Sequence, residues 1–119
     1  QTQVTFKGIF DGDGYVISNM KVTSAIEGNR GDAYAGLFGY INGNSSHIQN
    51  LGVKGEINVT TDKELYAGGI AGKTIDYIDN CYTDITIKSI ATGSGQCTIG
   101  GIVGNFGSSN SINNCSHNK

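Results

Sequence analysis

The 119-residue sequence has no Pro and no Trp, and only 15% of its residues are charged. Its 8 basic and 10 acidic residues give a net charge of −2 and form no basic patch interleaved with aromatic residues. Nucleic-acid binding depends on such a patch, so we expect no nucleic-acid partner. No apolar run approaches the ~20 residues that a membrane-spanning helix needs, so we also expect no membrane span.

The N-terminal residues show no charged segment followed by an apolar one, which is the pattern of a signal peptide. The chain also starts at Gln1 instead of Met. A segment cut from a larger protein explains both observations. The length predicts a single domain over residues 1–119, with a core of modest size.

Cysteine is scarce: the chain has only Cys81, Cys97 and Cys115. The number is odd, the spacing matches no zinc-binding pattern, and a disulfide framework in a chain of this size would need more cysteines. The sequence therefore predicts no metal-ligating, cofactor-binding or catalytic residue and no cofactor. Cysteine usage constrains the redox compartment only weakly.

What the sequence does have is glycine, 19 residues of it, among many β-branched, Ser and Asn residues, and this composition favours strands broken by tight turns. A Gly-apolar-apolar triplet recurs at offsets of 28, 33 and 32 (36−8, 69−36, 101−69). The four copies are Gly8-Ile9-Phe10, Gly36-Leu37-Phe38, Gly69-Ile70-Ala71 and Gly101-Ile102-Val103.

A second element, Ile-x-Asn-apolar, follows each triplet at offsets of 31, 30 and 34 (48−17, 78−48, 112−78). Its copies are Ile17-Ser18-Asn19-Met20, Ile48-Gln49-Asn50-Leu51, Ile78-Asp79-Asn80-Cys81 and Ile112-Asn113-Asn114-Cys115. In the first three units an alternating apolar and polar stretch comes next, which is the period of a strand with one buried face. The fourth unit ends at residues 116–119, before we expect such a strand to form.

One unit cannot bury its apolar face alone, but stacked units bury it together and pair each strand with its counterpart one repeat away. The sequence thus predicts an all-β fold, a right-handed parallel β-helix (β-solenoid) of about 3–4 coils. We expect both ends of the stack to be uncovered. Polar segments between the repeated elements are expected to be loops, namely Glu27–Tyr34, Gly43–Ser46, Thr61–Tyr66, Thr92–Gln96 and Gly107–Asn110.

The asparagines are expected at equivalent corners of the stack. Their amides can hydrogen-bond from one coil to the next, and Asn tolerates the left-handed backbone that a corner needs. The four positions are Asn19, Asn50, Asn80 and Asn114. The recurring glycines predict either a corner with positive φ or a close approach of two backbones.

The stretch from Phe6 to Met20 resembles the opening rung of bacterial pectate-lyase-like solenoids, and Ala35-Gly36-Leu37-Phe38-Gly39 is similar to the GLUG motif. Residues 68–72 and 100–104 look like further copies. Such repeats occur in large bacterial surface proteins, including IgA1-specific zinc metallopeptidases and adhesins. The resemblance implies a bacterial repeat segment located outside the cell or on its surface, in the cell wall. The His-Glu-x-x-His zinc site of the peptidases is absent here, so their activity does not carry over.

Few residues suggest chemistry. Asp11-Gly12-Asp13-Gly14 reads as a turn, because a calcium loop would need further ligands that Tyr15 and Val22 do not supply. His47 and His117 have no partner that suggests a catalytic pair. Cys81 and Cys115, aligned with Leu51 and Met20, are expected in the core as free thiols, with a disulfide between neighbouring coils as the alternative.

The acidic residues Asp76, Asp79 and Asp84 are expected at outward or loop positions, with no aligned partners that would form a catalytic pair. The sequence therefore predicts a non-catalytic repeat module of a secreted or cell-wall-associated protein, acting as a spacer or a binding surface. Its partner would be a host protein, a glycan or neighbouring domains of the parent chain. The alternative is a fragment of a carbohydrate-active β-helix enzyme, a polysaccharide lyase or glycosidase.

Overall fold

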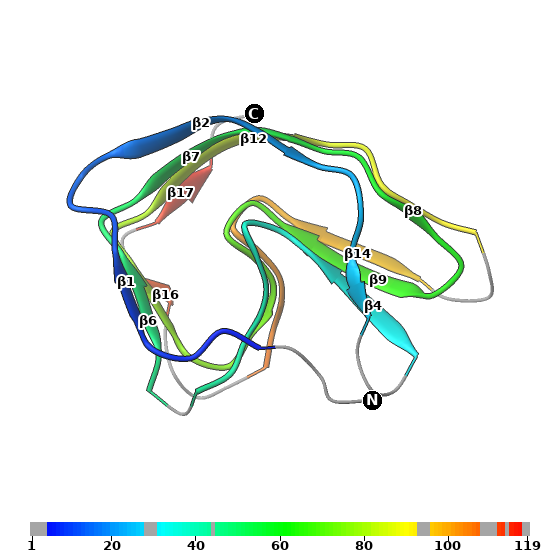
Figure 1. Cartoon of the computed structure of the whole chain (residues 1–119), viewed down its shortest axis with the longest axis horizontal. Coiled ribbons are helices and arrows are strands. Elements are labelled where there is room, and N and C mark those ends of the chain that lie inside the picture. Colours follow the sequence, from blue (N-terminus) through cyan, green and yellow to red (C-terminus); the bar gives the residue numbers. More distant parts are fainter. Residues whose placement is uncertain are drawn as a thin grey trace.

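The computed structural model of the chain describes residues 5–27, 31–43, 45–92, 96–107, 112–113 and 115–117. The described residues form seventeen short strands and no helix, and nearly all strand pairs are parallel (Figure 1). The prediction of an all-β fold is therefore confirmed. No helix in the described ranges has the length and hydropathy needed to cross a membrane.

Apart from β3 and β4, strands that follow one another in sequence belong to different sheets, and each sheet collects strands about one repeat apart. Three parallel sheets run in the order β1 (Ile9–Asp11), β6 (His47–Gln49), β11 (Tyr77–Asp79), β16 (Ile112–Asn113); β2 (Val16–Val22), β7 (Gly52–Ile57), β12 (Tyr82–Ile87), β17 (Ser116–His117); and β5 (Phe38–Ile41), β10 (Ala71–Thr74), β15 (Val103–Phe106).

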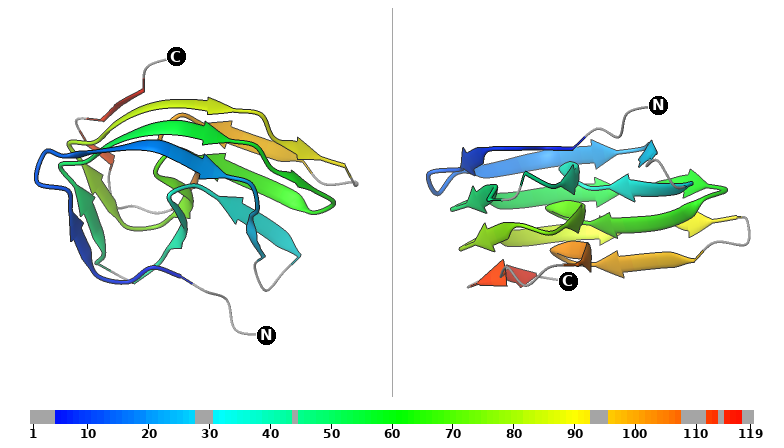
Figure 2. Two further views of the ribbon diagram at one scale, coloured as in Figure 1. Left: turned by 45° about the horizontal axis from the view of Figure 1, so that its top comes forward. Right: turned by 90° about the horizontal axis from the view of Figure 1, so that it is seen from below.

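The two remaining sheets are β8 (Thr60–Thr61) with β13 (Ile90–Ala91), and β3 (Ile26–Glu27), β4 (Asp32–Ala35), β9 (Glu64–Gly68), β14 (Cys97–Gly100). We call β1–β5 the first pass of the chain, β6–β10 the second, β11–β15 the third and β16–β17 the fourth. The passes lie as layers on one another (Figure 2). Only the β3–β4 pair, among the strands of the described ranges, is antiparallel.

The repeated elements predict the register correctly from β5 and β6 onward. Ile48 pairs with Ile78, which pairs in turn with Ile112. Ala71 likewise pairs with Phe38 on one side and with Val103 on the other. These pairs carry the predicted offsets of 30, 34, 33 and 32 (78−48, 112−78, 71−38, 103−71), so the two elements mark true structural repeats in these strands.

The predicted register of β1 and β2 in the first pass is wrong. Phe10, not Ile17, pairs with Ile48, and Ile17 instead pairs with Val53. Gly8-Ile9-Phe10 is likewise not equivalent to the later triplets, because Ile9 pairs with His47. Consequently Asn19 and Met20 do not lie at the corner of Asn50 and Leu51.

The irregularity lies in β2, where the register with β7 shifts between Ile17 and Met20. Asn19 has a φ of 59° at this point, and Gly55 opposite has a φ of 154°. A Cβ on Gly55 would lie 2.7 Å from the Met20 nitrogen, so only glycine leaves room for the displaced backbone. One extra residue of β2 is thus absorbed in a bulge, because three steps from Ile17 to Met20 face two from Val53 to Gly55 (20−17 = 3, 55−53 = 2).

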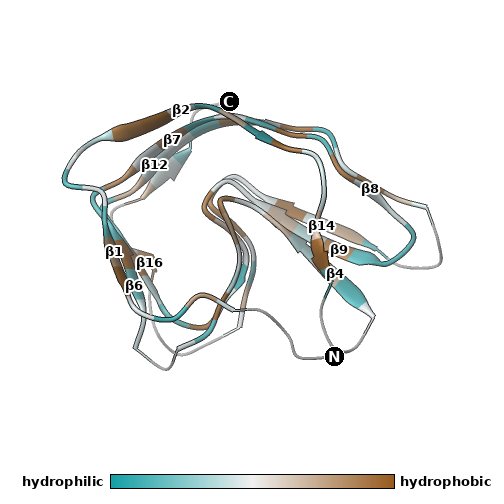
Figure 3. Ribbon diagram, in the orientation of Figure 1, coloured by the Kyte–Doolittle hydropathy of each residue, from teal (hydrophilic) through white to brown (hydrophobic). Residues whose placement is uncertain are grey.

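The core fills the interior between the sheets. Ile48, Ile78 and Val53 are completely buried, as the alternating pattern predicts. Figure 3 shows apolar residues at the same place in β1 and β6, and others along β4, β9 and β14. Side chains of the first and fourth passes, such as Phe10 and Ile112, pack against this core but are only partly buried. Burial is therefore most complete in the middle of the stack.

The recurring glycines serve close backbone approach in the turn between β9 and β10 and its equivalents. A Cβ on Gly72 would lie 2.7 Å from the backbone nitrogen of Ala35 and equally close to the carbonyl oxygen of Tyr66. A Cβ on Gly104, one pass later, would likewise lie 2.7 Å from the Ala67 nitrogen. The sheet of β5, β10 and β15 can thus fold back against the sheet of β4, β9 and β14.

Three further predictions need correction. The segments Glu27–Tyr34 and Thr61–Tyr66 are not wholly loops, because β4 and β9 begin within them and bury Tyr34 and Leu65. The fourth pass does form a strand, β17, which pairs with β12. The first end of the stack is covered in part, since β3 lies on the edge of β4, whereas β1 and β2 are themselves edge strands of their sheets. The other three expected loops fall partly outside the described residues.

Candidate functional site

Two groups of side chains outside the apolar core cluster are candidates for a functional surface. The first follows the corner after β1, β6 and β11. There Asn80 Nδ2 donates a hydrogen bond of 2.8 Å to Asn50 Oδ1, and Asn50 Nδ2 donates one of 3.1 Å to Asp11 Oδ1. Asn50 and Asn80 have φ values of 57° and 53°. The predicted ladder of left-handed asparagines is therefore confirmed between these two residues.

The ladder does not include Asn19, which lies in the bulge of β2, and Asn114 lies outside the described residues. Asp11 takes the place of an asparagine at the first pass, one residue before the equivalent corner position, Gly12. As a carboxylate it accepts hydrogen bonds and donates none. It therefore accepts the hydrogen bond of Asn50 but cannot donate one to a further residue. Asp11 also binds its own turn, accepting a hydrogen bond of 2.9 Å from the Asp13 nitrogen.

Residues 11–14 form the turn that the sequence predicts, closed by a 2.9 Å hydrogen bond from the Tyr15 nitrogen to the Gly12 oxygen. Asp13 adopts the left-handed conformation, with φ of 53°. The backbone N–H of Asp13 and the Asn50 amide favour the charged carboxylate and thereby lower the pKa of Asp11. The acidic stretch is a structural corner of the stack.

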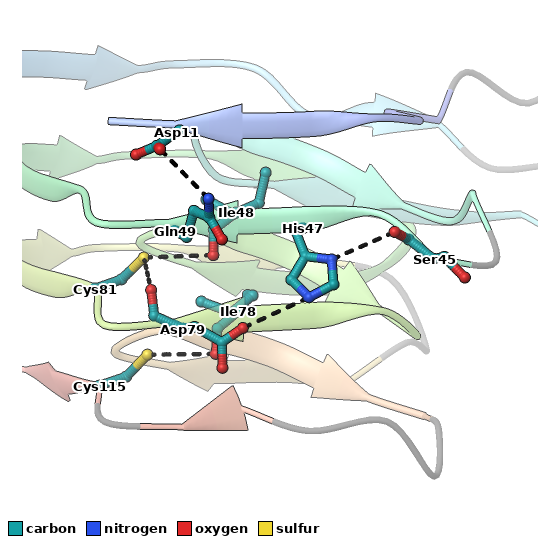
Figure 4. A network of polar contacts seen from close by, with 9 residues as sticks. All are labelled: Asp11, Ser45, His47, Ile48, Gln49, Ile78, Asp79, Cys81 and Cys115. Carbon is teal, nitrogen blue, oxygen red and sulfur yellow. Dashed lines mark hydrogen bonds and ion pairs between the residues drawn. The ribbon is translucent and has the colours of Figure 1, made fainter. Parts of the chain in front are cut away.

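Strands β6 and β11 of the same sheet place a histidine beside an aspartate, a contact that the sequence did not reveal. The His47 ring stacks on Tyr77 with centroids 4.5 Å apart, and its Nε2 lies 3.7 Å from Asp79 Oδ2 (Figure 4). His47 Nδ1 lies 3.4 Å from the carbonyl oxygen of Ser45. Both ring nitrogens of His47 therefore lie next to oxygen atoms of the chain itself. Neither nitrogen contacts a hydroxyl or thiol nucleophile in the described ranges.

His117 is exposed, as expected, but it belongs to β17, where its Nδ1 lies 2.8 Å from the Thr83 hydroxyl. The three acidic residues do not share one environment. Asp76 lies in the loop between β10 and β11, as predicted, but it is fully buried, and its Oδ2 accepts a 2.7 Å hydrogen bond from the Gly43 nitrogen. Asp79 and Asp84 are half-buried on different sheets.

The second candidate is a tyrosine face, defined as Tyr34, Tyr40, Tyr66 and Lys73. Tyr34 stacks on Tyr66 with centroids 5.8 Å apart and an interplanar angle of 18°, and it contacts the Tyr40 ring at 5.1 Å. Lys73 Nζ lies 5.3 Å from the centroid of Tyr40. The face joins strands of two sheets, β4 and β9 with β5 and β10.

Carboxylates border the tyrosine face. The Tyr34 hydroxyl donates a 2.9 Å hydrogen bond to Asp32 Oδ2. Burial, followed by this hydrogen bond, raises the pKa of Tyr34, and burial with the charge of Glu64 raises the pKa of Tyr66. Both hydroxyls therefore stay protonated at neutral pH and remain hydrogen-bond donors.

Tyr66 has two different neighbours along the stack. Tyr34 covers one side, whereas the residue paired with Tyr66 on the other side is the exposed Thr98. Tyr66 is half-buried, while Tyr34 and Tyr40 are 3% and 8% exposed. Tyr66 is thus flanked by an aromatic ring on one side and by a small, exposed residue on the other.

The described residues contain no group of three or more His, Cys, Asp or Glu side chains placed to hold a metal ion. No protein-family model, curated protein or solved structure matches the chain. The geometry of the ladder and of the tyrosine face is therefore the basis for a functional proposal.

Proposed function

We propose that the chain is a right-handed parallel β-helix that serves as a non-catalytic repeat module of a secreted or cell-wall-associated bacterial protein. In this role it is a spacer whose outward side chains form a binding surface. The polar groups of the ladder support this, because they hydrogen-bond to one another from pass to pass. Its location outside the cell follows from the resemblance to GLUG repeats.

The tyrosine face is the binding surface that we propose, and a glycan is its partner. The observation that carries this proposal is the half-buried Tyr66 ring, whose second side borders the small residue Thr98. Tyr offers a large amphipathic contact area at a low cost in conformational entropy. Lys73 and Glu64, on β10 and β9, supply the polar groups that orient a hydroxylated ligand.

Glycan binding can be measured on an immobilised glycan array with the wild-type chain and two tyrosine variants. Tyr66→Ala should weaken binding at least about tenfold, since aromatic anchors contribute more than about 1.4 kcal/mol. Tyr15→Ala is the matched control, because Tyr15 is 74% exposed and lies far away in the turn after β1. Equal binding by the two variants, or no glycan retained by the wild type, would contradict the proposal.

The non-catalytic part needs its own measurement. The wild-type chain should release no reducing ends and no unsaturated sugars from acidic and neutral polysaccharides during prolonged incubation. Product formation that disappears in Asp79→Asn would instead favour the carbohydrate-active alternative, because Asp79 is the outward carboxylate next to His47.

A further inference from the structure

Cys81 and Cys115 occupy the same place in the third and fourth passes. The pairs on either side of them fix this register: Asp79 pairs with Asn113, and Tyr82 pairs with Ser116. Both pairs have the same offset as the two cysteines (113−79 = 116−82 = 115−81). In-register residues of neighbouring strands lie about 4.8 Å apart, within the range of roughly 4.4–6.8 Å between the Cα atoms of a disulfide.

Neither cysteine is part of a disulfide, and the two side chains lie on the same side of the sheet corner (Figure 4). Cys81 Sγ lies 3.3 Å from the Asp79 oxygen, and Cys115 Sγ lies 3.7 Å from the Ile78 oxygen, so each sulfur is placed against the backbone of β11. The two side chains are neighbours across the third and fourth passes, and Figure 4 shows both sulfurs directed the same way, one above the other.

The two thiols differ in access and acidity. Cys81 is buried, whereas Cys115 is half-buried at the end of the described stack. The hydrogen bond from Cys81 stabilises the Cys115 thiolate and lowers the pKa of Cys115 to about 7. The same bond, together with burial, raises the pKa of Cys81. Cys115 is thus the reachable nucleophile, and Cys81 is the thiol that can resolve an adduct on it.

We propose that Cys81 and Cys115 form a modification site, a disulfide that joins the third and fourth passes under oxidising conditions. The oxidant is a low-molecular-weight disulfide such as oxidised glutathione. The Cys115 thiolate attacks one of its sulfurs, forming a mixed disulfide and releasing one glutathione thiolate, which takes up a proton. Cys81, as its thiolate, then attacks Cys115 Sγ and expels the second glutathione. The two protein thiols lose two electrons and two protons, and one oxidised glutathione becomes two reduced molecules.

The consequence is a staple on the last pass. The fourth pass has only two short strands among its described residues, β16 and β17, each of two residues. A disulfide that closes a loop of a whole repeat reduces the conformational entropy of the unfolded chain. It should therefore raise Tm by roughly 10 °C. Cys97 takes no part, because it lies on the β14 strand opposite Leu65.

The experiment uses Cys97→Ser, so that two thiols remain, titrated with oxidised glutathione in native buffer. We expect a loss of two hydrogens by mass spectrometry, a Cys81–Cys115 cross-linked peptide after digestion, and the higher Tm, all reversed by reductant. In Cys97→Ser/Cys81→Ala the reaction should stop at one glutathione on Cys115, and Tm should not rise.

Two results would overturn the proposal. One is a stable glutathione adduct on Cys115, or no reaction at all, in the folded Cys97→Ser chain. The other is a Cys81–Cys115 bond that forms only after urea unfolds the protein. Circular dichroism before oxidation shows whether each variant is folded, and a variant that is not folded is replaced by the corresponding Cys→Ser change.

Discussion

The first pass of the chain and the two that follow it are built from the same kinds of residue, yet they pair differently. β7 and β12 pair without interruption over six residues, from Gly52–Tyr82 to Ile57–Ile87. β2 and β7 pair with a register shift, a left-handed Asn19 and a glycine opposite it. In the second and third passes the strand after this sheet stacks in parallel, as β8 with β13, whereas β3 turns back onto β4.

This difference shows what sets the register of a stacked β-structure. The Ile-x-Asn motif occurs in the first pass, but its Ile17 lies in the sheet of β7 and not at the corner. Phe10 takes the position of Ile48 instead, and Asp11 receives the ladder from Asn50. Phe10 and Ile17 are both partly buried against the core, so burial alone does not distinguish them. A partner for the corner amide does, because Asp11 beside Phe10 accepts the hydrogen bond of Asn50.

The largest expected effect tests the middle of the stack. Ile78→Asp should abolish folding, because it places an unpaired charge at a fully buried position and costs more than about 4 kcal/mol. Ile9→Asp on the same sheet is the control, since Ile9 is 71% exposed and the variant should melt like the wild type. Circular dichroism during heating measures both. A cooperative transition in Ile78→Asp would contradict the stacking of Ile78 on Ile48 in the core.

A smaller effect is expected at the bulge. Gly55→Ala adds a Cβ that meets the Met20 backbone, at a φ that disfavours side chains, and should lower the free energy of unfolding by about 3 kcal/mol. Gly14→Ala is the control: its φ is 80° but nothing lies within 4 Å, so backbone strain of about 1 kcal/mol remains. Urea denaturation gives both values. Equal losses would mean that the close contact at Gly55 is unimportant.

The smallest effect separates two asparagines that the sequence makes equivalent. Asn50→Gly keeps a residue that accepts the left-handed backbone but removes two ladder hydrogen bonds, and should cost about 1.5 kcal/mol. Asn19→Gly should be close to neutral, because Asn19 has the same kind of φ but is not part of the ladder. Urea denaturation at pH 7 compares them. A larger loss in the free energy of unfolding for Asn19→Gly than for Asn50→Gly would favour the corner position that the motif predicts for Asn19.

Much of the fold could be predicted from the sequence, because the stack repeats local rules. Alternating residues identify the buried faces of β7 and β12, and the recurrence of Ile48 and Ile78 gives their mutual register. The first pass could not be aligned by the same means, since two candidate positions, Phe10 and Ile17, lie in the same pass. The choice between them depends on packing against the second pass, which no local pattern contains.

The candidate surfaces were harder to predict for the same reason. The offset that aligns Ile48 with Ile78 also brings Asp79 close to His47, so this pair was within reach of the sequence. The tyrosine face was not, because Tyr34 and Tyr40 lie on strands of different sheets. Their contact depends on how tightly the glycine-rich turn folds, which becomes visible only at positions such as Gly72.

The antiparallel β3–β4 pair has a consequence for how the chain folds. Its partners, Ile26 with Tyr34 and Glu27 with Ala33, are close in sequence (34−26 = 8, 33−27 = 6), whereas the parallel partners lie about one repeat apart. Closing the shorter loop costs about 1 kcal/mol less entropy than closing a loop of a whole repeat. We therefore expect this hairpin to form early, so that the second pass is laid down on an edge already in place.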